Sequence, residues 1–191
     1  MTPAEATAEL GRLRPADGEQ AQLLLEHRQQ LAAHPGRDGG FEGSALHREG
    51  PPEHLTASAL VLDTTGRRVL LVLHRRAGAW LQPGGHLEAP DASLLAGALR
   101  EASEETGLGP VLSPALGGAP ADLHRHALGP AFGRCREHLD VAFLLLAPAG
   151  AAPRASTESA RVAWFDLDAL PHGVVADLPP RLARARALLG S

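Results

Sequence analysis

The chain has 191 residues, of which 44% are hydrophobic and 21% are charged; this composition excludes disorder along the whole length and suits one domain with a short extension. With 22 acidic and 18 basic residues, the net charge of -4 argues against binding a nucleic-acid backbone or an anionic membrane. All the basic residues are Arg, which excludes Schiff-base chemistry on a lysine.

Three features point to a cytoplasmic protein. Cys135 is the single cysteine of the chain, so an internal disulfide cannot form and a reducing compartment is expected. The longest apolar run, residues 141–147, is too short to span a bilayer. The first residues lack the basic and apolar regions of a signal peptide. We therefore predict a cytoplasmic location, with no membrane and no nucleic acid among the partners.

Two helices are expected at the N-terminus, over residues 4–13 and 16–33. In the second stretch, leucines fall at helical spacing among Glu and Gln, and the His-Pro-Gly sequence at 34–36 ends it. We predict an N-terminal helical extension with a connector over residues 1–50, followed by the main domain over residues 51–191.

The rest of the chain predicts short strands around one strong helix. Residues 54–63 and 68–74 flank a turn that contains Gly and form a predicted hairpin. The strong helix is expected over residues 89–108, with Asp91 as its N-cap and Gly107 at its end. The remaining elements are strands near 121–126, 138–146 and 161–165 and a terminal helix at 178–189, with Leu178, Leu182 and Leu189 facing inward. This order predicts an α/β layered fold.

Three glutamates share one side of the strong helix. Glu101, Glu104 and Glu105 stand at positions i, i+3 and i+4, so their side chains lie together. Like charges near a helix C-terminus oppose helix formation, and Arg100 alone cannot neutralise three of them. Mg²⁺ can, because it prefers oxygen ligands and bridges carboxylates to substrate phosphates. Taken alone, the pattern is also typical of a solvated acidic face.

The residues around these glutamates resemble the signature of the Nudix hydrolase family, G-x5-E-x7-R-E-U-x-E-E-x-G-U with U aliphatic. Residues 100–108, REASEETGL, match its second half, and Gly85 matches its start. The middle departs from the signature, because Asp91 replaces the first glutamate and eight residues instead of seven separate it from Arg100. We therefore favour Asp91 as an N-cap over a metal ligand.

The resemblance reaches beyond the signature, over about residues 54–171. The sequence WLQPGG at 80–85 resembles the usual entry to the signature. Glu158, six residues before Trp164, resembles the downstream acidic loop that precedes the last strand of the family. The resemblance implies an α/β/α sandwich with a mixed sheet. It also implies hydrolysis of a diphosphate, usually a nucleoside diphosphate linked to another group, with Mg²⁺ or Mn²⁺.

The resemblance also implies roles for individual residues. It assigns the metal to carboxylates, here Glu88, Glu101, Glu104 and Glu105. Arg100 orients these carboxylates, and Gly85 lets the backbone approach the substrate closely. The general base is either Glu158 or one of the glutamates of the signature. Metal ions in such a site neutralise phosphate oxygens and activate a water for attack on phosphorus.

Substrate phosphates also need cationic side chains. Candidates are Arg76, which follows a predicted strand, and Arg134 and Arg136, which flank Cys135. Trp80 either stacks on a nucleobase or packs in the core.

The ten histidines show no spacing typical of metal ligands. For His74 and His86 we therefore favour solvated or hydrogen-bonding roles over a zinc site. For Cys135 we favour a structural or incidental thiol, although its flanking arginines could lower its pKa.

Two other functions compete with diphosphate hydrolysis. A catalytically silent module of the same fold could sense a nucleotide, but such modules often lose the glutamates that this chain keeps. An isoprenoid diphosphate isomerase would use Cys135 as an acid or base. The sequence does not specify the leaving group, which we expect residues 109–120 and 127–137 to determine. A homodimer is the default oligomer, and the N-terminal extension could support it or cover the site.

Overall fold

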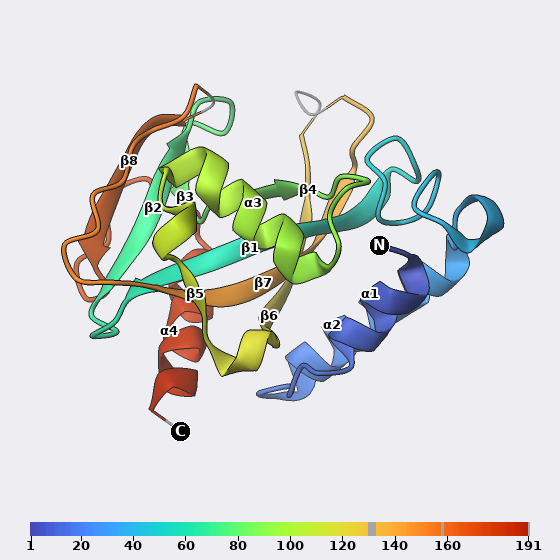
Figure 1. Ribbon diagram of the computed structural model, residues 1–191, viewed down its shortest axis with the longest axis horizontal. Helices are drawn as coiled ribbons and strands as arrows, with labels where there is room; N and C mark the ends of the chain where they lie inside the picture. The colour runs from blue at the N-terminus through green and yellow to red at the C-terminus, as the bar shows by residue number, and fades with distance from the viewer. Residues whose placement is uncertain (130–132, 158, 191) are drawn as a thin grey trace.

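The computed structural model describes residues 1–129, 133–157 and 159–190 (Figure 1). The strands of its eight-stranded sheet are β1 (Glu53–Asp63), β2 (Arg68–His74), β3 (Ala79–Leu81), β4 (Gly84–His86), β5 (Ser113–Pro114), β6 (Pro120–Ala127), β7 (Glu137–Ala147) and β8 (Ser159–Asp166). The α-helices are α1 (Pro3–Leu10), α2 (Gly18–Ala33), α3 (Leu94–Thr106) and α4 (Leu178–Leu189). The predicted α/β class and the helical N-terminal part are confirmed.

The sheet is mixed and is built around β1. Strand β1 pairs in parallel with β7 along its full length, from Glu53 opposite Glu137 to Asp63 opposite Ala147. The path through the sheet runs β3-β2-β1-β7-β5, while β4 pairs with β1, β6 with β7 and β8 with β2. These other pairings are antiparallel. The N-terminal half of β1 therefore lies between β4 and β7.

Strand β1 is buried on both faces, and its alternating side chains serve two cores. Leu55, Ala57, Ala59 and Val61 pack in the core that contains residues of α3. Leu60 and Leu62, at alternate positions, pack in the core between the sheet and α4. Since neighbouring side chains of a strand point to opposite faces, the polar residues at 54, 56 and 58 lie on the α4 side.

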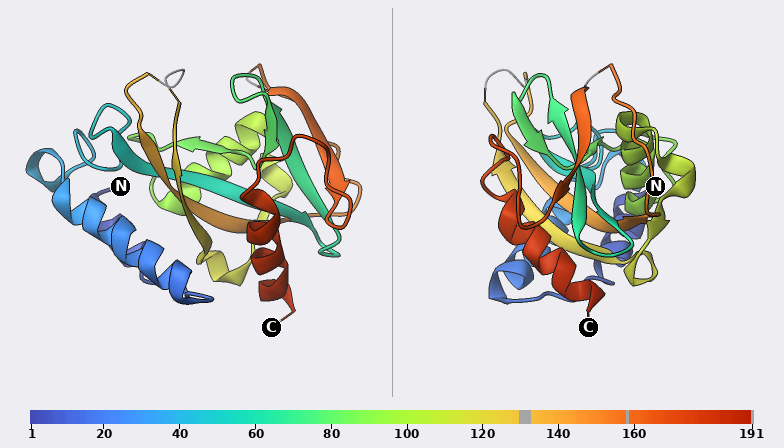
Figure 2. Two further views of the ribbon diagram at one scale, coloured as in Figure 1. Left: turned by 180° about the vertical axis from the view of Figure 1, so that it is seen from behind. Right: turned by 90° about the vertical axis from the view of Figure 1, so that its left-hand side faces the viewer.

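Helices α3 and α4 cover opposite faces of the sheet, which gives the predicted α/β/α arrangement (Figure 2). The terminal helix begins and ends where the sequence predicts, and Leu178 and Leu182 are buried. The prediction that Leu189 faces inward is wrong, because this side chain at the last helical residue is 37% exposed. Arg181 and Ala185 complete the buried face of α4 instead.

Helices α1 and α2 lie side by side and join the same core as α3 (Figure 1). Ala6 and Leu10 of α1 and Leu31 of α2 are buried with Leu94 and Ala98 of α3. The boundary near residue 50 stays a prediction. Every helix within the described part of the chain is too short or too polar to traverse a bilayer.

Candidate functional site

Helix α3 carries the predicted carboxylates, and its ends are fixed by local contacts. Its N-cap is Ser93, whose hydroxyl accepts from the Ala96 N–H at 3.0 Å. Glu9 of α1 accepts from the N–H groups of the first two helical residues, Leu94 and Leu95, at 2.8 and 3.0 Å. Gly107 ends the helix with a φ of 69°, as predicted. Free N–H groups at a helix start need acceptors, so these contacts set where α3 begins.

The predicted N-cap at Asp91 is therefore wrong, and the helix starts later than residue 89. The Asp91 carboxylate is 6% exposed and engages Arg100 instead. The Arg100 Nε and Nη2 atoms donate to the two Asp91 oxygens, each at 3.1 Å, a bidentate pair. Asp91 Oδ2 also accepts from the Glu88 N–H at 2.8 Å. Asp91 thus holds Arg100 and shapes the loop before α3.

Arg100 collects the carboxylates of the site around one nitrogen. Its Nη1 lies 3.1 Å from Glu101 Oε1, 3.2 Å from Glu104 Oε2 and 3.8 Å from Glu88 Oε1. Burial of the guanidinium opposes its charge, but the hydrogen bonds to Asp91 and the charge of Glu101 outweigh burial and raise the pKa of Arg100. The residue therefore stays cationic. These contacts show that the carboxylates can converge on a single positive charge.

The two glycines of strand β4, Gly84 and Gly85, contact the acidic side of α3. A Cβ on Gly85 would lie 2.6 Å from Glu101 Oε1, closer than side chains allow. Next to it, the Gly84 N–H donates to Glu105 Oε2 at 2.9 Å. Glu105 is 5% exposed. Two of the three glutamates are therefore held against backbone. A Cβ on Gly84 would lie 2.4 Å from the Cβ and 2.7 Å from the Cα of Ser58, so Gly84 has to be small, whereas the contact at Gly85 is with the end of a flexible side chain.

The oxygen donors of this side fit a hard divalent cation. Glu88, Glu101, Glu104 and Glu105 supply carboxylates, which Mg²⁺ and Mn²⁺ prefer. The Glu88 and Glu104 side chains are 60% and 59% exposed, so both can turn toward an ion at the surface. Glu101 and Glu105 lie deeper against β4 and give the site a fixed wall.

The other predicted residues lie in different environments. Arg76 is exposed in the turn between β2 and β3. Arg134 is exposed and its Nη1 lies 3.6 Å from Glu49 Oε2 in the connector. Arg136 is exposed and its N–H donates to the Pro52 carbonyl at 2.9 Å. Glu158 lies outside the described residues.

Trp80 and His74 have structural contacts. Trp80 is 7% exposed and packs edge-on against Phe165, with ring centroids 4.8 Å apart. His74 Nδ1 accepts from the Ala77 N–H at 3.1 Å, which agrees with a hydrogen-bonding role. The packing role is therefore the one that the structure supports for Trp80.

Two clusters of buried and partly buried polar side chains were not predicted. One is an ion network between α4 and the sheet. There Arg181, which is 1% exposed, donates to Asp122 of β6 at 2.6 Å and to Asp140 of β7 at 2.8 Å. The second, which we call the His/Cys cluster, consists of His54, His86, Cys135 and His138. The ion network joins α4 to β6 and β7, and the His/Cys cluster joins β1, β4 and the start of β7, so both depend on contacts between elements that the sequence does not specify.

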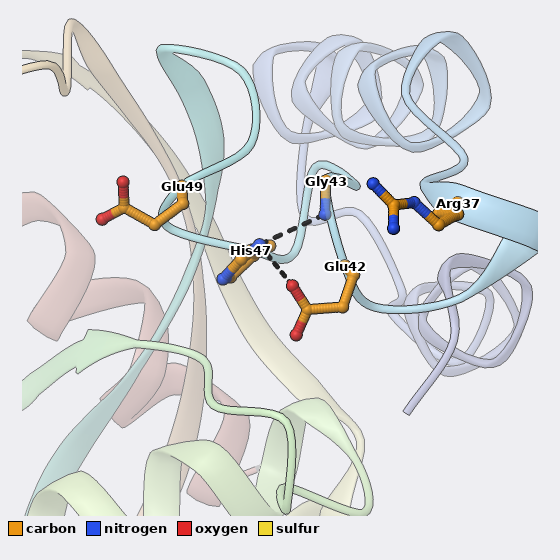
Figure 3. A pocket seen from close by; sticks show the side chains of 5 residues that line it. All are labelled: Arg37, Glu42, Gly43, His47 and Glu49. Carbon is orange, nitrogen blue, oxygen red and sulfur yellow. Dashed lines mark hydrogen bonds and ion pairs between the residues drawn. The ribbon is translucent and has the colours of Figure 1, made fainter.

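A pocket of about 560 Å³ lies elsewhere, in the N-terminal connector (Figure 3). It is lined by Arg37, Glu42, Gly43, His47 and Glu49. Within it His47 Nδ1 accepts from the Gly43 N–H at 3.2 Å and lies 3.4 Å from Glu42. Its two glutamates and its arginine are scattered around one imidazole, so the α3 carboxylates remain the better candidate for metal chemistry.

The chain is similar to known proteins in sequence and in fold. The model of the NUDIX domain family matches residues 52–187. A NUDIX-family hydrolase from Clostridium perfringens has a TM-score of 0.55 and 22% identity, over 72% of this chain and 96% of that chain. An Ap4A hydrolase from C. elegans, in a binary complex, has a TM-score of 0.57 and 18% identity, over 71% and 97% of the two chains. The MutT protein from Methanosarcina mazei Go1 has a TM-score of 0.57 and 23% identity, over 74% and 98%. No curated protein matches the chain.

Proposed function

This chain belongs to the NUDIX domain family, and on that premise we propose that it hydrolyses a diphosphate linkage in a nucleoside diphosphate joined to another group. The resemblance predicted from the sequence is confirmed, and with it the Nudix-type hydrolase class. The substrate, the metal and the residue roles are our proposal.

The observation that carries the proposal is the contact between the acidic side of α3 and the two glycines of β4. Glu101 fills the space where Gly85 lacks a side chain, and Glu105 accepts from the Gly84 N–H. Both carboxylates are thereby fixed beside the partly buried backbone of β4, next to the exposed side chains of Glu88 and Glu104. Preorganised groups of this kind do not have to be reordered during the reaction, which is the main source of electrostatic catalysis.

We assign Mg²⁺ or Mn²⁺ to Glu101, Glu104 and Glu105, with Glu88 as a further ligand, direct or through water. When bound, such an ion neutralises phosphate oxygens and lowers the pKa of a coordinated water. Arg100 positions the carboxylates, since its own charge is already shared with Asp91, Glu101 and Glu104. Either Glu158 or one of the α3 glutamates accepts the proton of the attacking water.

The substrate class is set by groups outside α3. We propose Arg76, Arg134 and Arg136 as ligands of the substrate phosphates, because arginine binds phosphate bidentately. The Ap4A hydrolase with a similar fold supports including dinucleoside polyphosphates among the substrates to test. A cytoplasmic location and a homodimer stay predictions from the sequence.

The test is release of phosphate-containing products from nucleoside triphosphates, nucleotide sugars, dinucleoside polyphosphates and dinucleotide cofactors, with Mg²⁺ or Mn²⁺. We expect wild type to cleave at least one class and Glu104→Gln to lose most of that activity. Glu19→Gln, an exposed glutamate at the start of α2, is the matched control and should retain it.

Each alternative has its own outcome in this test. A wild type that cleaves nothing but is thermally stabilised by a nucleotide would refute hydrolysis and favour a sensor. Conversion of an isoprenoid diphosphate that is lost in Cys135→Ser would favour an isomerase instead.

A further inference from the structure

Four side chains with metal-ligating atoms meet on the α4 side of the sheet. They come from the start of β1 (His54), the end of β4 (His86), the start of β7 (His138) and the segment just before β7 (Cys135). One ligand atom from each lies within 4.8 Å of all the others. None of the four belongs to the carboxylate set of α3.

The strand register explains why these distant residues meet. The parallel pairing of β1 with β7 places His54 directly opposite His138. The antiparallel pairing of β1 with β4 places His86 opposite Thr56, two residues along the same face from His54. The segment that carries Cys135 is held beside the start of β1, because the Arg136 N–H donates to the Pro52 carbonyl at 2.9 Å. The cluster is thus built on backbone hydrogen bonds.

The imidazole nitrogens are presented as ligands. His54 Nδ1 lies 3.0 Å from the Pro51 carbonyl oxygen, so Nδ1 carries the proton and Nε2 keeps its lone pair. A hydrogen bond from the other ring nitrogen to a backbone carbonyl is the usual support of a metal-bound histidine. Nε2 of His54 and Nε2 of His138 are buried and have no hydrogen-bond partner among the residues that the structure describes. Buried polar atoms without a partner are rare in native proteins, and an ion would satisfy both.

The distances are close to those of tetrahedral coordination. Cys135 Sγ lies 3.8 Å from His86 Nε2, and the centroids of the His54, His86 and His138 rings are 5.0 to 5.1 Å apart. Zinc bonds of about 2.1 Å to nitrogen and 2.3 Å to sulfur separate neighbouring ligand atoms by about 3.3 to 3.6 Å. Side-chain shifts of about 1 Å would bring the four atoms to that separation.

We propose that His54, His86, Cys135 and His138 bind one Zn²⁺ ion at a site separate from the carboxylates of α3. Imidazole and thiolate ligands favour zinc over Mg²⁺, which requires oxygen ligands. Four protein ligands close the coordination shell, so the site is structural rather than hydrolytic. Binding converts the Cys135 thiol to a zinc-bound thiolate and releases its proton to solvent.

The ion would fix the strand that supports the carboxylates. The His86 carbonyl accepts from Arg100 Nη2 at 2.8 Å, and Gly84 and Gly85 directly precede it in β4. Zinc at the His86 side chain therefore anchors β4 from the face opposite α3. This inference stands on the cluster alone and does not depend on the proposed hydrolysis.

The test is titration of the full chain, stripped of metal by a chelator, with Co²⁺ as a spectroscopic substitute for zinc. We expect one equivalent to give the visible bands of tetrahedral cobalt and a near-ultraviolet thiolate charge-transfer band, both removed by Zn²⁺. Because Cys135 is the one cysteine of the chain, the thiolate band identifies it without any mutation. Zn²⁺ should also raise the melting temperature.

Variants then assign the other ligands and separate the two sites. His138→Gln should weaken cobalt binding at least tenfold, whereas His126→Gln, a neighbour 5.3 Å from the His138 ring, should retain it. Glu104→Gln should leave the thiolate band unchanged, even if it abolishes hydrolysis. Wild type without a thiolate band at stoichiometric Co²⁺ would overturn the proposal, as would equal cobalt binding by wild type and His138→Gln.

Discussion

Gly85→Ala tests whether the contact between β4 and α3 sets the position of Glu101. The new Cβ would lie 2.6, 2.8 and 2.9 Å from three atoms of the Glu101 carboxyl group. To reach an ordinary contact of 3.4 Å, Glu101 Oε1 must retreat by about 0.8 Å. Its hydrogen bond with Arg100 Nη1 is 3.1 Å long and would stretch toward breaking.

This displacement should affect the reaction far more than stability. A shift of about 1 Å in a positioned catalytic group costs roughly 10²-fold in rate. The free energy of unfolding should fall by less than about 1.5 kcal/mol, because the clash is with the end of a flexible side chain and not with backbone. We expect kcat/KM on the best substrate of the panel to fall about 10²-fold. The same enzyme should need more Mg²⁺ for half-maximal rate.

Gly18→Ala is the matched control, because a Cβ there meets no atom within 4 Å and the residue is the first of α2. It should keep the wild-type rate and stability. Full activity of Gly85→Ala at the wild-type Mg²⁺ requirement would show that the position of Glu101 is not needed for the reaction.

Three further predictions follow from contacts in the structure. Arg181→Met should lower the free energy of unfolding by roughly 3–5 kcal/mol in urea denaturation, because it removes the arginine that pairs with buried Asp140 and leaves buried Asp122 with Arg184 alone. The exposed Arg186→Met should change that free energy by less than about 0.5 kcal/mol, and equal effects of the two substitutions would contradict the network. Burial alone would raise the pKa of Asp63, but hydrogen bonds from Thr65 and the backbone outweigh it and lower that pKa. Its charge therefore stabilises the fold above the unfolded pKa of 3.8, and this stability is lost as the pH falls through the folded pKa. The stability difference between Asp63→Asn and wild type should therefore shrink below pH 3.8, and a difference that is constant with pH would contradict this. Glu105→Gln keeps an oxygen for the Gly84 N–H, so it should lose activity by roughly 10²-fold with little change in melting temperature; a large drop in melting temperature would assign Glu105 to stability instead.

The long elements could be predicted from the sequence because each has a clear period or a clear end. Strand β2 and helix α4 have the predicted bounds, and the ends of β1, β6, β7 and β8 lie within two residues of the predicted ones. Strands β3, β4 and β5 were missed, since two or three residues are too few to show an alternating pattern. The start of α3 was misplaced because Glu9, a residue of another helix, supplies two of its N-terminal acceptors.

The candidate site was predictable where it lies within one segment. The carboxylates of α3 and their relation to Arg100 follow from helical spacing and from the family signature. Asp91 was harder to interpret, because its pairing with Arg100 depends on how the longer loop folds. The His/Cys cluster could not be predicted, because His54 and His138 meet only through the parallel register of β1 and β7. Arg181 has the same difficulty, since a buried arginine on an amphipathic helix looks like a surface residue until its partners are known.

The most direct test of the account is hydrolysis of the best substrate in water labelled with heavy oxygen, with and without Mg²⁺, followed by mass spectrometry of the products. We predict cleavage that requires the metal, with the label in a phosphate-containing product, because water attacks phosphorus. Glu104→Gln should form little labelled product under the same conditions. No metal-dependent cleavage by wild type, or label found only in the group released from phosphate, would contradict the account.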